Sequence, residues 1–193
     1  MTMQLNPITD PFADRRLWTR DECRKMEVMG LLEPGRYELL DGIVVLKSSI
    51  NEAHMVTCMK TYLALVMLYG AEHVRLPGPV ALNEQNEPVP DFAITARPDE
   101  DYPRPDIPPA SDIRLILEVS DTTFWRDATT KARIYARAEI PEYWVLHVPR
   151  RVLLSHRQPC NGEYIDIQEH TEATLFAPLS LPNKPFSIAD LLP

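Results

Sequence analysis

Apolar residues recur along the chain with spacings that distinguish helices from strands. Between Asn51 and Gly70 they return every three to four positions, which predicts a core-facing helix. The recurring apolar residues are Met55, Met59, Tyr62, Leu63, Val66 and Met67. The stretch from Ile113 to Val119 is short and almost entirely apolar, which is typical of a strand buried on both faces.

Capping and turn residues mark the ends of the first elements. Thr19-Arg20-Asp21-Glu22 is a capping-box pattern that predicts a helix as far as Leu32, stopped by Pro34-Gly35. Asp41-Gly42 joins two apolar runs, 36–40 and 43–47, and predicts a β-hairpin with a type I′ turn.

The remaining elements alternate between strands and helices. Strands are expected at about 74–82, 89–95, 113–119, 142–148, 152–157 and 163–168, with a proline-dense loop at 97–111 and a helix at 126–138. This order indicates an α/β protein with a mixed sheet flanked by helices. We expect one domain over 1–193, with an N-terminal arm (1–17) and a proline-rich, weakly structured C-terminal tail (169–193).

Composition narrows the setting in which the protein works. The 193 residues are 45% hydrophobic and 25% charged, as in ordinary globular proteins, and no apolar stretch is long enough to span a membrane. Three cysteines without CxxC spacing and the lack of a secretory signal favour buried, reduced thiols and a cytoplasmic protein. The formal net charge of −8 argues against a broad basic surface, so any contact with nucleic acid must be local. Candidates include Arg126, Arg133 and Arg137.

Two acids end or interrupt apolar, strand-like runs. They are Asp91, in Val89-Pro90-Asp91-Phe92, and Glu118, in the strand 113–119. A buried carboxylate is costly unless a cation compensates it, and carboxylate oxygens suit Mg²⁺ or Mn²⁺, with the backbone carbonyl of Val119 as a further ligand. Lys131, on the next helix, is placed to orient or deprotonate an attacking water. The alternatives are acids at a solvated rim and an exposed Lys131–Asp127 helix pair.

Other polar residues give weaker signals. Glu38 interrupts the apolar run Tyr37–Leu40, where strand alternation favours an outward-facing residue over a third acid of the site. His54 is more typical of a helix start than of a ligand, and the five histidines lack the spacing of a zinc site. Ser120 lies beside an acid but lacks the context of a serine nucleophile.

Several of these motifs, taken in order, resemble the Uma family of "putative restriction endonucleases", within the PD-(D/E)XK nuclease superfamily. They are Tyr37-Glu38-Leu39-Leu40-Asp41-Gly42, His54, Val89-Pro90-Asp91, Leu117-Glu118-Val119-Ser120, Arg126 to Lys131, and Tyr135 to Trp144. The resemblance implies a restriction-endonuclease-like αβββαβ core, here with extra N-terminal and C-terminal strands. It also implies that Asp91 and Glu118 are metal ligands and that Glu38 is an accessory acid. The superfamily lysine position holds Ser120 here, so the resemblance transfers that role to Lys131.

We therefore expect a Mg²⁺-dependent endonuclease (Mn²⁺ possible) that hydrolyses DNA and works as a homodimer, because cutting a duplex takes two sites. The alternative is a non-catalytic nucleic-acid- or protein-binding module on a nuclease fold, which the acidic charge favours. A carboxylate-pair glycoside hydrolase ranks last, because aromatic residues make up only 8% of the chain.

Overall fold

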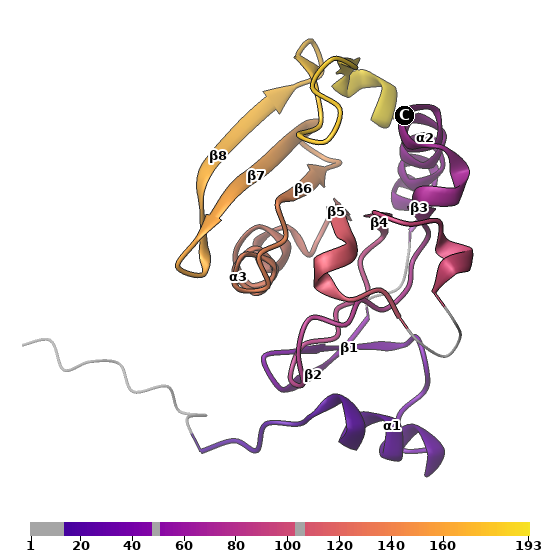
Figure 1. The fold of residues 1–193 in the computed structure, drawn as a ribbon, viewed down its shortest axis with the longest axis vertical. Helices are drawn as coiled ribbons and strands as arrows, with labels where there is room; N and C mark the ends of the chain where they lie inside the picture. Colours follow the sequence, from indigo (N-terminus) through magenta and orange to yellow (C-terminus); the bar gives the residue numbers. More distant parts are fainter. Residues whose placement is uncertain (1–13, 48–50, 103–106) are drawn as a thin grey trace, which may run out of the picture.

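A six-stranded mixed sheet forms the centre of the computed structural model, which describes residues 14–47, 51–102 and 107–193 (Figure 1). The strand order is β3-β4-β5-β6-β7-β8. Only β5 and β6 pair in parallel, and every other neighbouring pair in this sheet is antiparallel. The bounds are β3 (Val74–Arg75), β4 (Phe92–Thr95), β5 (Ile113–Ser120), β6 (Glu142–His147), β7 (Val152–Cys160) and β8 (Glu163–Thr171).

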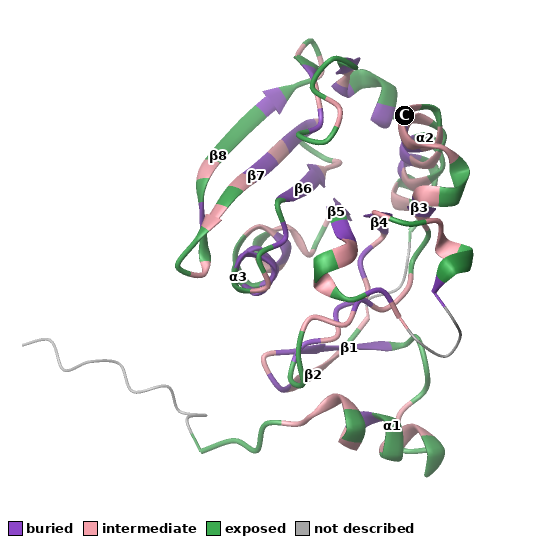
Figure 2. Ribbon diagram, viewed as in Figure 1, coloured by how far each residue is buried: buried purple, intermediate pink, exposed green. Residues whose placement is uncertain are grey.

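Helices cover both faces of this sheet. On one face α2 (Glu52–Tyr69) packs through Leu65 on a core that includes Leu117. On the other, α3 (Ala132–Arg137) packs through Tyr135 on a core that includes Ile116. Successive residues of a strand face opposite sides, so Glu118 lies on the α3 side. The order α2-β3-β4-β5-α3-β6 confirms the expected αβββαβ core, and the central strands are buried (Figure 2).

The N-terminal elements follow their local signals closely. Helix α1 (Arg20–Val28) opens with the predicted capping box, in which Thr19 and Glu22 bond to each other's backbone amides. It ends earlier than Leu32, because Gly30 takes a left-handed conformation (φ 72°) and Leu31 N–H donates to the Met26 carbonyl (2.8 Å). Strands β1 (Tyr37–Leu40) and β2 (Ile43–Leu46) form the expected hairpin, with positive φ at both turn residues, Asp41 and Gly42.

The strand expected at 74–82 is much shorter. Strand β3 stops at Arg75, and the chain up to β4 makes only isolated bridges, such as Ala81 with Pro109. The reason is the density of prolines, which lack the N–H that a strand ladder needs. They are Pro77, Pro79, Pro88 and Pro90.

The buried face of α2 also differs from the sequence expectation. Thr57, Thr61 and Leu65 are buried, whereas four of the six apolar residues that define the pattern are exposed, namely Met55, Met59, Leu63 and Met67. Because α2 is apolar on nearly all sides, its spacing does not identify the face that packs. The hydroxyls of both threonines donate to backbone carbonyls, which satisfies them inside the protein.

The C-terminal tail is ordered, contrary to the expectation of weak structure. It forms β9 (Leu175–Phe176), β10 (Phe186–Ser187) and the 3₁₀ helix η5 (Ile188–Leu191). Leu191 is fully buried, and its carbonyl accepts the hydrogen bond from Thr61. The tail therefore completes the core on the α2 side.

Three segments, 1–13, 48–50 and 103–106, lie outside the described residues, and they include most of the expected N-terminal arm and part of the proline-dense loop. Among the described residues, no helix is both long and apolar enough to cross a membrane.

Candidate functional site

A cavity of about 110 Å³ lies where the hairpin strand β1, the start of α2 and the end of β5 meet. All the residues that sequence analysis selected as metal ligands or catalytic groups line it: Glu38, Asp91, Glu118, Val119 and Lys131. The β4–β5 register ends at Phe92 and Leu117, so Asp91 and Val119 lie just beyond the last pair of these strands. The cavity is therefore at the end of the sheet, where strand ladders no longer use every backbone group.

Lys131 joins two carboxylates inside the protein. Its Nζ donates to Glu38 Oε1 and to Glu118 Oε1, both at 2.8 Å, and all three side chains are buried. The Tyr135 hydroxyl also donates to Glu118 Oε1 (3.1 Å). The structure thus places Glu38 inside the site, although strand alternation alone favoured an outward-facing residue.

An irregular helix delivers Lys131 to this position. Residues Arg126–Lys131 form a π-helix that continues directly into α3, and such segments are frequent at functional sites. Asp127 is buried one turn earlier and accepts hydrogen bonds from Ser120 Oγ (2.7 Å) and Thr123 Oγ1 (2.5 Å). Its Oδ1 is 3.9 Å from Lys131 Nζ, but both side chains are buried. The exposed Lys131–Asp127 pair considered from sequence is therefore wrong.

Burial and charge act in opposite directions on these groups. Burial raises the pKa of Glu118 to about 8, an effect that Lys131 opposes and Asp127 and Asp91 reinforce. Burial alone would lower the pKa of Lys131, but the carboxylates of Glu118 and Glu38 outweigh it and raise the pKa. Lys131 is therefore held as an ammonium and is unsuited to deprotonating a water.

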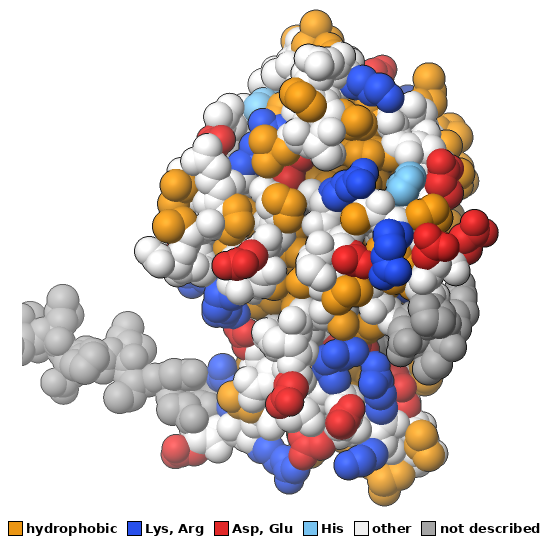
Figure 3. All heavy atoms as spheres, in the orientation of Figure 1, with side chains coloured by type: hydrophobic (Ala, Val, Ile, Leu, Met, Phe, Trp, Pro, Cys, Tyr) orange, Lys and Arg blue, Asp and Glu red, His pale blue; other side chains and the backbone are white. Residues whose placement is uncertain are grey.

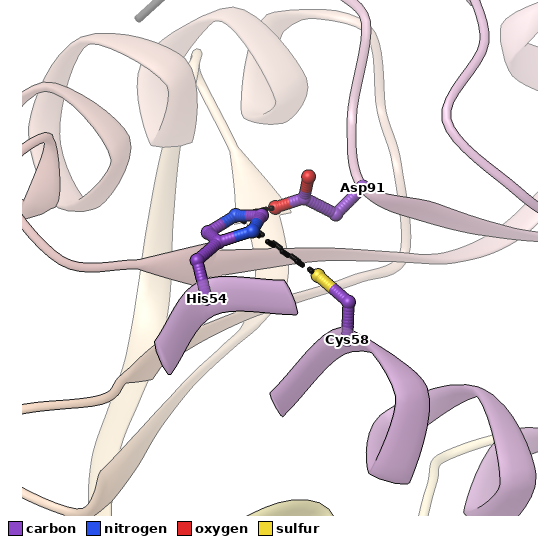
Figure 4. Close-up of side chains that lie close together, drawn as sticks. All are labelled: His54, Cys58 and Asp91. Carbon is purple, nitrogen blue, oxygen red and sulfur yellow. Dashed lines mark hydrogen bonds and ion pairs between the residues drawn. The ribbon is translucent and has the colours of Figure 1, made fainter. Parts of the chain in front are cut away.

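Asp91 is oriented from two sides. The Val119 N–H donates to Asp91 Oδ2 (2.8 Å), and His54 Nε2 lies 3.4 Å from the same oxygen. Figure 4 shows His54 and Cys58, one turn apart on α2, next to Asp91. The hydrogen bond to Asp91 raises the pKa of His54 to about 10, with Cys58 adding to the effect.

Sequence analysis missed the involvement of His54 and Cys58. The available signal was their i, i+4 spacing at the start of a helix, which puts two side chains on one face. The expectation that the thiols are buried holds for Cys23 but not for Cys58, which is half-buried, or Cys160, which is exposed.

The donor set of the cavity fits a hard divalent cation. Three buried carboxyl groups, those of Glu38, Glu118 and Asp127, face a single buried ammonium, which leaves excess negative charge for a cation to compensate. Glu118 and Asp91 each use one oxygen for internal bonds, and no described residue donates a hydrogen bond to the other oxygen. Oxygen ligands of this kind suit Mg²⁺ and Mn²⁺.

The arginines expected to contact nucleic acid are not gathered at the cavity. Arg133 pairs with Glu163 (3.0 Å) and Arg137 with Asp41 (2.5 Å), whereas Arg126 lines the cavity and its Nε is buried without a hydrogen-bond partner among the described residues. On the face shown in Figure 3, Lys and Arg side chains are scattered among acidic ones. The expected basic patch is therefore reduced to Arg126.

Comparison with known proteins agrees with this fold. No curated protein matches the chain. The crystal structure of a "putative nuclease belonging to DUF820" from Anabaena variabilis is similar in fold, with a TM-score of 0.62 and 14% sequence identity over 86% of this chain and 94% of that one. The model of the Uma2 family, described as "Putative restriction endonuclease", matches residues 21–188, a range that includes every cavity residue discussed above. The chain therefore belongs to the Uma2 family of nuclease-fold proteins.

Proposed function

We propose that this protein is a Mg²⁺-dependent endonuclease, with Mn²⁺ as a substitute, that hydrolyses phosphodiester bonds in DNA. The observation that carries the proposal is the excess of carboxylates over cations around Lys131, in a cavity within the region matched by the nuclease family. Asp91, Glu118 and the carbonyl of Val119 would hold the metal. A bound divalent ion supplies Lewis-acid stabilisation of phosphate oxygens and lowers the pKa of a bound water.

The side chains around the metal ligands have separate roles in this proposal. Glu38 and Glu118 hold the Lys131 ammonium at the cavity wall, where it stabilises negative charge on the phosphate. Glu38 is thus an accessory acid that positions Lys131. Arg126, whose Nε has no hydrogen-bond partner in the described part of the chain, is the proposed phosphate-binding residue.

The charge of the molecule constrains how it would bind DNA. With a net charge of −8 and the Arg133 and Arg137 side chains paired to acids, few phosphates are neutralised. Affinity should be weak, and its salt dependence shallow, at about −0.9 in log–log slope per phosphate contacted. We propose that the active form is a homodimer, which would bring one site to each strand.

Metal titration and DNA cleavage test the proposal together. We expect Mg²⁺ and Mn²⁺ binding by calorimetry in the wild type and its loss in Asp91→Asn and Glu118→Gln, with plasmid cleavage lost in parallel. Glu163→Gln, an exposed acid outside the cavity wall, is the matched control and should retain both. Unchanged metal affinity in both site variants would refute the ligand assignment. Metal binding without cleavage of any DNA would favour the non-catalytic binding module.

A further inference from the structure

His54, Cys58 and Asp91 bring three different donor atoms together on one side of the cavity. Cys58 Sγ lies 3.4 Å from His54 Nδ1 and 4.0 Å from Nε2, and Nε2 lies 3.4 Å from Asp91 Oδ2. One donor atom from each residue lies within 4.8 Å of the other two. Figure 4 shows the three side chains converging from α2 and from the segment before β4.

With His54 Nε2 as the imidazole ligand, its 3.4 Å distance to Asp91 Oδ2 matches the spacing of ligands around a tetrahedral metal ion, and its 4.0 Å distance to Cys58 Sγ is slightly longer. Zinc bonds of about 2.0–2.3 Å to nitrogen, oxygen and sulfur imply ligand atoms about 3.3–3.8 Å apart. Small rotations of the half-buried Cys58 side chain would close the remaining difference. The carboxylate is already oriented by the Val119 N–H, in the way that outer hydrogen bonds orient metal ligands.

The chemistry of the donors differs from that of the Mg²⁺ site proposed above. A thiolate and an imidazole select softer ions such as Zn²⁺, whereas Mg²⁺ prefers oxygen alone. Three protein ligands leave a fourth position, and His54 and Asp91 both line the cavity. In the proposed cleavage reaction His54 does no more than orient Asp91 and Cys58 has no role, so that reaction does not account for the thiol in the cluster.

We propose that His54, Cys58 and Asp91 form a binding site for Zn²⁺ or a similar thiophilic divalent ion. This site stands on the geometry of the three side chains alone. A consequence that does rest on the proposed function follows from the shared ligand: Zn²⁺ on Asp91 excludes Mg²⁺ from that carboxylate and inhibits the nuclease.

Cobalt titration of the full chain tests the site directly, because a Co²⁺–thiolate bond gives a charge-transfer absorption band in the near ultraviolet. We expect this band in the wild type and in Cys160→Ser, the exposed-cysteine control, and its loss in Cys58→Ser. His54→Gln should lower Co²⁺ affinity by at least about 100-fold, since losing even an outer-shell partner costs about 10- to 100-fold. Circular dichroism would verify that each variant is folded. If Cys58→Ser does not fold, the Co²⁺ affinity of His54→Gln decides whether the site exists.

A wild type without the band at saturating Co²⁺, or a band that survives in folded Cys58→Ser, would overturn the proposed site. Mg²⁺ calorimetry after loading with Zn²⁺ tests whether the two ions share Asp91. Loss of the Mg²⁺-binding heat in the wild type but not in Cys58→Ser would support sharing. Mg²⁺ binding that Zn²⁺ leaves undisturbed in the wild type would refute the proposed exclusion of Mg²⁺. The cobalt band does not depend on cleavage. A protein that shows the band but never binds Mg²⁺ would thus retain the soft-metal site while the proposed nuclease function failed.

Discussion

Replacing Lys131 with methionine removes the buried cation and leaves its carboxylate partners in place. Methionine is apolar and nearly as long, so the change deletes a charge without opening a large cavity. Glu38 and Glu118, both at 2.8 Å from Nζ, would lose their common partner while remaining buried. Breaking a buried ion pair from one side costs about 3–5 kcal/mol. We expect the free energy of unfolding to fall by that amount in metal-free protein.

Urea unfolding in the presence of a chelator, followed by the fluorescence of buried Trp144, measures this loss. Arg133→Met is the matched control, because Arg133 lies on the same helical segment and pairs with Glu163 on the surface, with both side chains at least 60% exposed. Such exposed pairs contribute about 0–1 kcal/mol. A loss in Lys131→Met no larger than that in Arg133→Met would refute the view that Lys131 compensates the buried acids.

Four further results are expected. Lys131→Met should slow DNA cleavage by about 10²- to 10³-fold in single-turnover assays, as expected for losing one group that stabilises transition-state charge, while Mg²⁺ affinity by calorimetry stays nearly intact; an equal rate would refute its role. Arg126→Gln should weaken DNA binding more than Arg133→Gln does in a salt-series binding assay, because only Arg126 reaches the cavity; equal losses would count against that contact. Burial lowers the pKa of His156 from 6.5 to about 4, so the native state resists its protonation. As the pH drops from 6.5 to about 4, the free energy of unfolding should therefore fall by up to about 1.4 kcal/mol per pH unit on account of His156. A pH dependence as steep in His156→Phe as in the wild type would contradict this. Leu191→Ala should cost about 2–5 kcal/mol in urea unfolding, whereas a neutral result would mean that the tail does not complete the core.

Signals that act over a few residues were readable from the sequence. The capping box at Thr19 and the Asp41-Gly42 turn both form as expected, because each depends on bonds between near neighbours or on the backbone freedom of glycine. The order of helices and strands in the core follows from the same patterns. Short motifs spread along the chain also pointed to the Uma2 family, because they contain the side chains that line the cavity.

Tertiary structure decided which faces pack and which charges meet. The apolar spacing of α2 did not reveal that Thr57 and Thr61 face the core, because only the C-terminal tail provides the carbonyl that one of them needs. Glu38 is 93 residues from Lys131 in sequence and 2.8 Å away in space, a contact that no local pattern contains. His54 and Cys58 likewise meet a third donor atom only because the fold places Asp91, just before β4, beside α2. Local rules specify elements, whereas burial, which sets the cost of each charge, exists only once the elements pack together.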